Sequence, residues 1–231
     1  MPNTQTIKHL GIILDGNRRW AKNKNLPTLQ GHRVGYDNVK SICELAFNRG
    51  IKILTVWAFS TENWKRSKEE VGYLMKLLKR AVTKDAEYYK KKDVGIKVIG
   101  RMSDLDKDLQ KRIKNIEEIT RNCAKGILRI GINYGGRVEL VDALKKIVKA
   151  KIPFDKIDEK TISENIYTPN IPNPDLIIRT SGEQRLSGFL LWQSPYSELY
   201  FPKVCWPDFS EKDLDEAIEW FNNRKRRFGG D

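Results

Sequence analysis

Short apolar runs alternate with longer amphipathic stretches along this chain. The apolar runs are rich in isoleucine, leucine and valine and end in polar residues, as buried strands do. The predicted strands are residues 9–15, 52–59, 96–100, 127–133 and 176–178, with residues 199–201 as a candidate edge strand. Most successive strands are far enough apart for a helix to lie between them, which is the pattern of a parallel sheet.

The amphipathic stretches predict helices. In residues 34–48 apolar side chains recur on one helical face, and Gly50 follows as a stop signal. Further helices are predicted at residues 68–91, 105–124 and 137–150, and Ser210 is the predicted cap of a last helix. We therefore expect an α/β fold in which helices flank a mainly parallel central sheet on both sides, within a single domain over residues 1–231.

Four of the predicted strands end in loops with many polar residues. These loops are DGNRRW after Leu14, STENWKR after Phe59, NYGGR after Ile132 and RTSGEQR after Ile178. Each alone is an ordinary turn sequence. Because the carboxyl ends of parallel strands lie at one edge of a sheet, the four together predict one ligand crevice. Asp15 would meet several arginines there, which is typical of a site for a metal-bound phosphate ester.

The long predicted helix over residues 68–91 has a broad apolar arc. Its core stripe includes Leu74 and Leu78, and Leu77 widens the arc beyond one packing face. The helix is therefore either broadly buried or lines an apolar cavity. An apolar tunnel beside the cationic crevice would suit an amphiphile with a diphosphate head and a hydrocarbon tail.

The composition says more about where the protein is expected to be located than about its function. The chain has 231 residues, 39% of them hydrophobic, and a formal net charge of +13, which suits nucleic acid, anionic lipid headgroups and polyanionic small substrates equally. Residues 1–8 lack the apolar stretch of a secretory signal, and the longest apolar runs are too short to cross a bilayer. We expect a cytoplasmic protein, or one peripheral on a membrane. Cys43 and Cys123 are expected as reduced, buried thiols on helices.

Several familiar chemistries are excluded by motifs that the chain lacks. It has no GxxxxGK[ST] phosphate loop, no GxGxxG fingerprint after the first strand and no GxSxG nucleophile elbow. Its only histidines are His9 and His32, which argues against a histidine-rich metal site.

Nearly the whole chain resembles the cis-prenyltransferase family, which includes the undecaprenyl diphosphate synthases and isoprenyl transferases. The matching segments, in the family's order, are HLGIILDGNRRW (9–20), GH (31–32), AFSTENW (58–64), NYGGR (133–137), IRTSGEQR (178–185), FLLWQ (189–193), SELYF (197–201), WPDF (206–209) and RRFG (226–229). The resemblance implies that isopentenyl diphosphate is condensed in cis configuration with an allylic prenyl diphosphate, farnesyl or geranylgeranyl. The product would be a polyprenyl diphosphate, a carrier-lipid precursor, and the reaction would require Mg²⁺.

The resemblance also implies roles for individual residues. Asp15 would be a catalytic residue and a magnesium ligand, Glu198 the second metal carboxylate, and Asn63 the candidate for proton removal. Because a carboxamide is a poor base, diphosphate and Asp15 remain alternative proton acceptors. The implied substrate-binding residues are Gly16, Asn17, Arg18, Arg19 and Trp20 around the allylic diphosphate, Arg179, Arg185, Leu186 and Ser187 around isopentenyl diphosphate, and His32, Ser60, Thr61, Glu62, Trp64 and Arg66 along the same crevice.

Some positions bear on specificity and assembly. Thr28 stands where many members of the family have an arginine, so one cation is missing or is replaced by a neighbour such as Arg33. Residues 227–229 match a terminal Arg-x-Gly that reaches across a dimer in the family, which implies a homodimer. Ala58 favours a long product, whereas residues 186–188 resemble short-product members, so the sequence leaves product length open.

Two other function classes remain as alternatives. A non-catalytic partner subunit of a heteromeric prenyltransferase typically loses the first loop, whereas Asp15, Asn17 and Arg19 are present here. A nucleic-acid-binding protein is favoured only by the basic charge and six tryptophans, without a recognised binding motif, so we expect no nucleic-acid partner. Trp64 and Trp206 have packing as an alternative role, which is the one we favour for Trp206.

Overall fold

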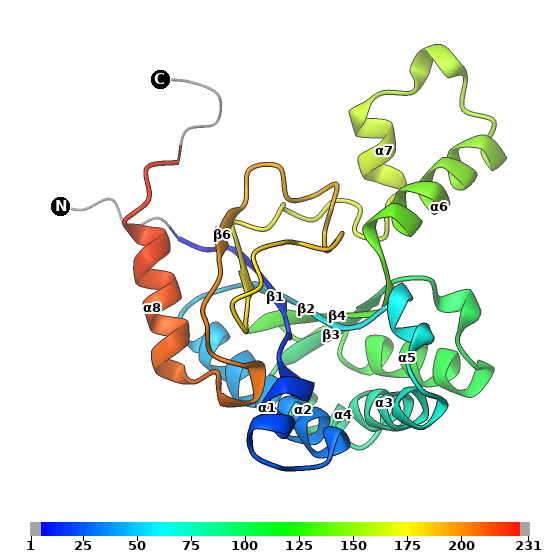
Figure 1. The fold of residues 1–231 in the computed structure, drawn as a ribbon. Coiled ribbons are helices and arrows are strands. Elements are labelled where there is room, and N and C mark those ends of the chain that lie inside the picture. Colours follow the sequence, from blue (N-terminus) through cyan, green and yellow to red (C-terminus); the bar gives the residue numbers. More distant parts are fainter. Residues whose placement is uncertain (1–5, 227–231) are drawn as a thin grey trace.

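Six parallel strands form one sheet in the order β3-β4-β2-β1-β5-β6 in the computed structural model, which describes residues 6–226 (Figure 1). The strands are β1 (His9–Ile13), β2 (Ile53–Ser60), β3 (Val94–Ile99), β4 (Gly126–Tyr134), β5 (Leu176–Arg179) and β6 (Glu198–Tyr200). The predicted α/β class with a parallel sheet is confirmed, and so is the edge strand. All the carboxyl ends lie at one edge of the sheet, which is the edge that carries the polar loops.

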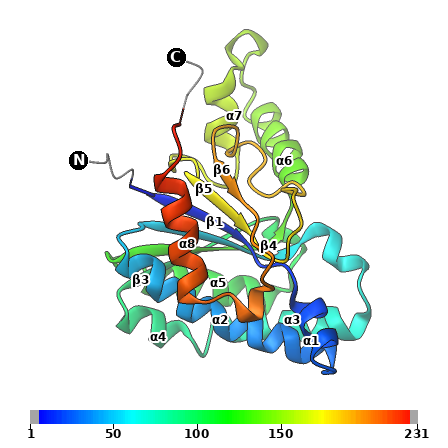
Figure 2. The ribbon, with the colours of Figure 1, turned by 60° about the vertical axis from the view of Figure 1, so that its left-hand side comes forward.

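Helices follow most of the strands. They are α1 (Asn17–Asn23), α2 (Thr28–Asn48), α3 (Lys68–Ala81), α4 (Ala86–Lys91), α5 (Lys107–Ile119), α6 (Gly136–Lys149), α7 (Glu159–Asn165) and α8 (Glu211–Asn222), with short 3-10 helices η1 (Thr61–Lys65), η2 (Met102–Asp104), η3 (Phe154–Lys156) and η4 (Trp206–Asp208). In both ribbon views α6 and α7 project away from the layer formed by α2, α3 and α4 (Figure 2).

The two faces of the sheet are covered differently. On one face, strand residues such as Leu10, Leu54 and Leu128 pack against α2, α3, α5 and α8 in the main core cluster. On the other face, a smaller cluster contains Ile177 and is covered by Phe189 and Leu190 from the segment after β5. Strands β1 and β5 therefore place alternate side chains into two cores, as their two-residue period requires.

Helix boundaries differ from the predictions most clearly at two places. The predicted helix over residues 68–91 is interrupted between α3 and α4. At the interruption, the Asp85 side chain accepts a hydrogen bond from Tyr36 of α2 and pairs with Lys40 of the same helix. Helix α2 begins at Thr28, six residues before the predicted start at residue 34. The earlier start was not predicted because Gly31 and Gly35 obscure the apolar period. Both glycines are needed there: a Cβ would lie 2.1 Å from the Asn17 backbone oxygen at Gly31 and 2.2 Å from Asn17 Oδ1 at Gly35.

The short helices α1 and α7 were not predicted, although the sequence of α7 contains a helix-start signal. Helix α7 begins with a capping box in which Asp158 accepts from the Thr161 N–H, a pattern visible in the sequence. Helix α1 has no side-chain cap. The predicted Ser210 cap of α8 is confirmed, since Ser210 and Asp213 form a capping box.

The cysteine prediction holds for one of its two residues. Cys43 is buried, but Cys123 is half-buried and lies beyond the end of α5, because that helix stops at Ile119. Within residues 6–226, no helix combines the length and apolarity needed to cross a membrane.

Candidate functional site

A cavity of about 940 Å³ lies at the carboxyl ends of β1 and β2, between the sheet and helices α1, α2 and α3. Its lining is polar at one end and apolar at the other. The ionisable side chains in the lining are Asp15, Arg18, Arg19, Lys22, His32, Tyr36, Glu62, Arg66 and Arg179, and the apolar ones include Leu14, Val39, Leu74, Leu77 and Leu78. The predicted apolar tunnel beside a cationic crevice is therefore present, and α3 lines it.

Asp15 is the central carboxylate of the polar end. It lies two residues after the end of β1, and its Oδ2 accepts hydrogen bonds from Arg179 Nη2 at 2.8 Å and Nε at 3.2 Å. Its Oδ1 accepts from the Gly16 N–H at 2.7 Å. Burial opposes ionisation of Asp15, but the hydrogen bonds and charge of Arg179 outweigh burial and lower the pKa of this carboxyl. Asp15 is therefore ionised at neutral pH.

Arg179 joins the first loop to the last. Besides Asp15, it donates through Nη1 to the Arg185 backbone oxygen at 2.6 Å and to Ser187 Oγ at 2.8 Å. Arg179 is buried at the end of β5, which pairs with β1 so that Arg179 is opposite Ile13. The guanidinium thus arranges three loop groups around the polar end of the cavity, and Ser187 lines the cavity with it.

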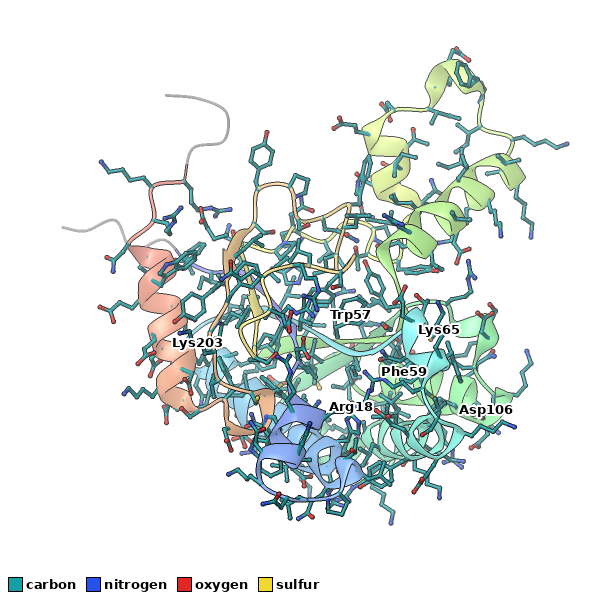
Figure 3. All side chains as sticks on the ribbon, in the orientation of Figure 1. Arg18, Trp57, Phe59, Lys65, Asp106 and Lys203 are labelled. Carbon is teal, nitrogen blue, oxygen red and sulfur yellow. The ribbon has the colours of Figure 1, made fainter. Side chains whose placement is uncertain are left out.

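Gly16 makes the turn from β1 into α1. Its φ of +105° is favourable only for glycine, and it places Asn17 against the glycines of α2. The Asn17 Oδ1 atom is buried without a hydrogen-bond partner among the described residues. This turn brings Arg18 and Arg19 to the cavity; Arg18 is labelled on α1 in Figure 3, across from Trp57 of β2, which also lines it.

Glu183 is a site residue to which the sequence analysis gave no role. It lies 3.2 Å from Arg19 Nη1 and also pairs with Arg185. Arg19 donates in addition to the Ser181 backbone oxygen at 3.1 Å. Glu183 therefore holds the two arginines of the first and last loops, and its place in the charged RTSGEQR motif was the available signal.

A buried polar cluster joins α2 to α3 beside the cavity. His32 Nε2 is 2.9 Å from Glu70 Oε1, and the same oxygen accepts from Arg66 Nη1 at 2.9 Å. Burial lowers the pKa of His32, so its imidazole is neutral at neutral pH. Glu70 was missed by the sequence analysis, although Ser67 accepts from its N–H at the start of α3 and the S-x-x-E spacing marks it.

The STENW loop contributes only part of its residues to the cavity. Ser60, Glu62 and Asn63 line it, and the Asn63 Oδ1 atom accepts from the Ser60 N–H at 3.1 Å. Trp64 does not line it: its Nε1 donates to Asn133 Oδ1 at 2.7 Å and its ring meets Phe59 edge-on. Figure 3 labels Phe59 in this region and Lys65 at the end of η1, where Lys65 is exposed.

The structure corrects several predicted placements. The NYGGR loop supports the STENW loop through Asn133 and does not line the cavity, so the prediction that all four loops meet in one crevice is wrong for it. Tyr134 of that loop is buried and donates to Glu139 at 2.6 Å. The other predicted substrate residues that stay out of the lining are Trp20, Thr61, Trp64, Arg185 and Leu186. Trp20 is buried on α1, where Lys24 Nζ lies 4.9 Å from the centre of its ring.

Glu198 lies away from Asp15 within this chain. It begins β6 opposite Leu176, at the amino end of β5, whereas Arg179 and Asp15 are at the carboxyl ends. Its carboxylate is 3.2 Å from Arg224 Nε. The two predicted metal carboxylates therefore do not share one site inside a single chain.

Two further predictions concern neighbouring residues. Arg33 is paired with Asp37 at 2.9 Å and is not in the cavity lining, whereas Lys22 lines the cavity together with Thr28. Trp206 packs as expected, because this ring is buried and its Nε1 donates to the Gly35 backbone oxygen at 2.7 Å, but it also contributes to the cavity lining. The predicted dimer tripeptide at residues 227–229 lies outside the described residues.

Comparisons with known proteins agree on one family. A family model described as "Putative undecaprenyl diphosphate synthase" matches residues 13–229. The chain is 46% identical over 225 residues to an isoprenyl transferase of Thermotoga maritima, covering 96% of this chain and 97% of that one. It is 47% identical over 229 residues to a tritrans,polycis-undecaprenyl-diphosphate synthase (geranylgeranyl-diphosphate specific) of Thermoplasma volcanium, covering 96% and 88%.

The fold is also similar to that of a solved plant enzyme. The crystal structure of lavandulyl diphosphate synthase from Lavandula x intermedia, in complex with dimethylallyl diphosphate, matches with a TM-score of 0.92 and 37% identity. The match covers 97% of this chain and 98% of that one.

Proposed function

We propose that this chain, which belongs to the undecaprenyl diphosphate synthase family of prenyltransferases, condenses isopentenyl diphosphate with an allylic prenyl diphosphate in cis configuration. The observation that carries the proposal is the cavity with arginines and Asp15 at one end and leucines of α3 at the other. Such a cavity suits a substrate with an anionic head and a hydrocarbon tail. The proposed primer is farnesyl or geranylgeranyl diphosphate, and the proposed product is a polyprenyl diphosphate used as a carrier-lipid precursor.

Asp15 is the proposed magnesium ligand. Magnesium prefers oxygen donors and is commonly held by one or two carboxylates together with substrate phosphates and water. The donors fit, because the Asp15 carboxylate is ionised and lies at the cavity wall among cations that would hold phosphate oxygens. When bound, the metal would supply positive charge to the departing diphosphate. Glu198 is not proposed as a ligand of this metal within one chain, because it lies at the amino end of β5.

The chain's own residues supply binding and orientation. Arg18, Arg19 and Arg179 would bind phosphate oxygens, and their charge would stabilise the negative charge that grows as the allylic carbon–oxygen bond breaks. The new carbon–carbon bond forms to the terminal carbon of isopentenyl diphosphate, which then loses a proton. Asn63 would orient the substrate near that proton, since its carbonyl oxygen is held by the Ser60 N–H and its amide group is a poor base. The proton would pass to diphosphate or to Asp15.

We also propose a homodimer, with contact at a membrane surface when the product is long. Support for the dimer comes from α6, on which Val141, Leu144 and Val148 are 48%, 51% and 67% exposed. An exposed apolar stripe of this kind is typical of a protein interface. The proposed location is the cytoplasm.

The non-catalytic alternatives are less well supported. A partner subunit would need neither an ionised Asp15 nor the arginines around it, yet these groups share one cavity. For a nucleic-acid-binding protein, a cavity with leucines at one end has no evident use.

The test is incorporation of labelled isopentenyl diphosphate with geranyl, farnesyl or geranylgeranyl diphosphate as primer, with and without magnesium. We expect magnesium-dependent incorporation and a ladder of polyprenyl products. Folded protein that incorporates no label with any primer would contradict the proposal and favour the partner-subunit alternative.

A further inference from the structure

The apolar part of the cavity lies between α2 and α3, and polar contacts join these helices at two levels. Near the amino ends, His32 meets Glu70. Farther along the two segments, Tyr36 of α2 donates a hydrogen bond to Asp85, which lies between α3 and α4. Beyond it, Glu44 of α2 accepts a hydrogen bond from Tyr88 of α4. Residues with higher numbers on α2 contact residues with higher numbers on the α3–α4 segment, so the two segments run in the same direction. The Tyr36 level is therefore farther from the polar loops than the His32 level.

Tyr36 belongs to a cluster of polar and charged groups between α2 and the start of α4. Asp85 is 6% exposed, accepts from the Tyr36 hydroxyl and lies 2.8 Å from Lys40 Nζ. The Arg80 guanidinium lies 5.7 Å from the centre of the Tyr36 ring, and Lys40 Nζ lies 5.6 Å from it. A ring held by a hydrogen bond at its tip and by cations at its face has one fixed position.

The cluster stands where the apolar lining stops. Along α2 the lining residues end with Tyr36 and Val39, and along α3 they end with Leu77 and Leu78. The next polar groups, Lys40 and Asp85, are outside the lining. A hydrocarbon tail that grew past this point would have to separate Asp85 from Tyr36 and Lys40, and a hydrocarbon offers no replacement hydrogen bond.

We propose that Tyr36, held by Asp85 and Lys40, closes the far end of the hydrocarbon space and limits the length of the prenyl chain that this protein holds. This inference rests on the proposed function. It makes Tyr36 a specificity-determining residue, and Asp85 and Lys40 positioning residues that act through it.

The test uses Tyr36→Ala, with Tyr36→Leu as a second variant that is too short to reach Asp85 but keeps an apolar side chain. The matched control is Tyr88→Phe. Tyr88 also donates its hydroxyl to a carboxylate of α2, Glu44, but it is not in the cavity lining. The control therefore loosens the same pair of elements without changing the tunnel. Thermal unfolding checks that each variant is folded.

Two measurements are made on each protein. The first is the length distribution of products from labelled isopentenyl diphosphate. The second is the affinity for a series of unreactive n-alkyl diphosphates of increasing chain length, which needs no turnover. For the parent and for Tyr88→Phe we expect affinity to stop rising at one chain length. For Tyr36→Ala we expect that limit to move by at least one five-carbon unit, with about tenfold tighter binding of the longer chain.

The outcomes separate the two proposals. An unchanged length limit in folded Tyr36→Ala and Tyr36→Leu, or an equal shift in Tyr88→Phe, overturns the inference. Parent protein that binds alkyl diphosphates with a limit that Tyr36→Ala extends, but makes no product, supports the inference while the proposed activity fails. Absence of any alkyl diphosphate binding overturns both.

Discussion

Asp15 of the first polar loop and Arg179 of β5 face each other across two neighbouring strands, with Arg179 Nη2 2.8 Å from Asp15 Oδ2. Arg179, the last residue of β5, is opposite Ile13, the last residue of the parallel strand β1, and Asp15 lies in the loop that follows β1. The pair gives an ionised carboxylate beside a cation fixed by Ser187 and the Arg185 backbone. The proposed metal ligand and a guanidinium proposed to bind phosphate are thus adjacent in the structure.

Replacing Asp15 by alanine should abolish most turnover. With magnesium present, we expect kcat to fall by about a hundredfold to a thousandfold, as when one preorganised group that stabilises developing charge is removed. The matched control is Asp37→Ala, since Asp37 is exposed, pairs only on the surface of α2 with Arg33 and is not in the cavity lining. Near-normal turnover of Asp15→Ala in the radiolabel assay would contradict the proposed role.

Lys22 should serve as the additional cation that Thr28 does not provide. It lines the cavity, whereas Arg33 is held by Asp37. We expect Lys22→Ala to raise the KM for the allylic diphosphate by about threefold to tenfold, with a smaller effect at high salt because an exposed charge is screened. Lys24→Ala is the control, since Lys24 pairs with Asp208 and does not line the cavity. Equal effects of the two substitutions would argue against a specific role for Lys22.

Acid should destabilise the folded chain through His9. Burial lowers the pKa of His9 to about 4, against 6.5 for an exposed histidine. Between these values the unfolded chain binds a proton and the folded chain does not, so stability from His9 is present above pH 6.5 and falls as the pH falls towards 4. We expect His9 to account for about 2 kcal/mol of the loss in unfolding free energy between pH 7 and pH 5.

Urea unfolding of the parent and of His9→Gln at these two pH values measures this contribution. The substitution also removes the hydrogen bonds of His9 to Thr55 and to the Pro172 backbone oxygen, so the variant will be less stable at both pH values. The informative quantity is the difference between the two pH values, which should shrink in the variant. The same pH dependence in both proteins would show that His9 is not the responsible group.

A charge on the exposed face of α6 should dissociate the proposed dimer. Leu144 is 51% exposed in the middle of the apolar stripe. We expect Leu144→Asp to give a monomer by sedimentation, because a carboxylate buried in an interface would lack a partner. Lys212→Asp on α8 is the control, since Lys212 is exposed and pairs with Glu216 within its own helix. A parent protein that is already monomeric would contradict the dimer.

The sequence by itself determined the positions of the strands, the parallel orientation of the sheet and the polar loops that follow the strands. Strand runs, turn signals and the Ser210 cap are local patterns, so residues a few positions apart carry the whole signal. That Asp15 meets arginines at the polar edge also followed from its place after a strand. No tertiary information was needed for these predictions.

Only the tertiary structure decided which residues face the cavity. At the break between α3 and α4, Asp85 contacts α2, and outside the cavity Asn133 of the NYGGR loop accepts a hydrogen bond from Trp64. Both are contacts between residues distant in sequence. The packing of α2 against α3 places Tyr36 in the cavity lining and Glu70 beside it, in contact with His32. Glu198 lies away from the cavity because β6 pairs with the amino end of β5. Helical and strand periods say which side chains share a face, but which face meets a cavity is set by how whole elements pack.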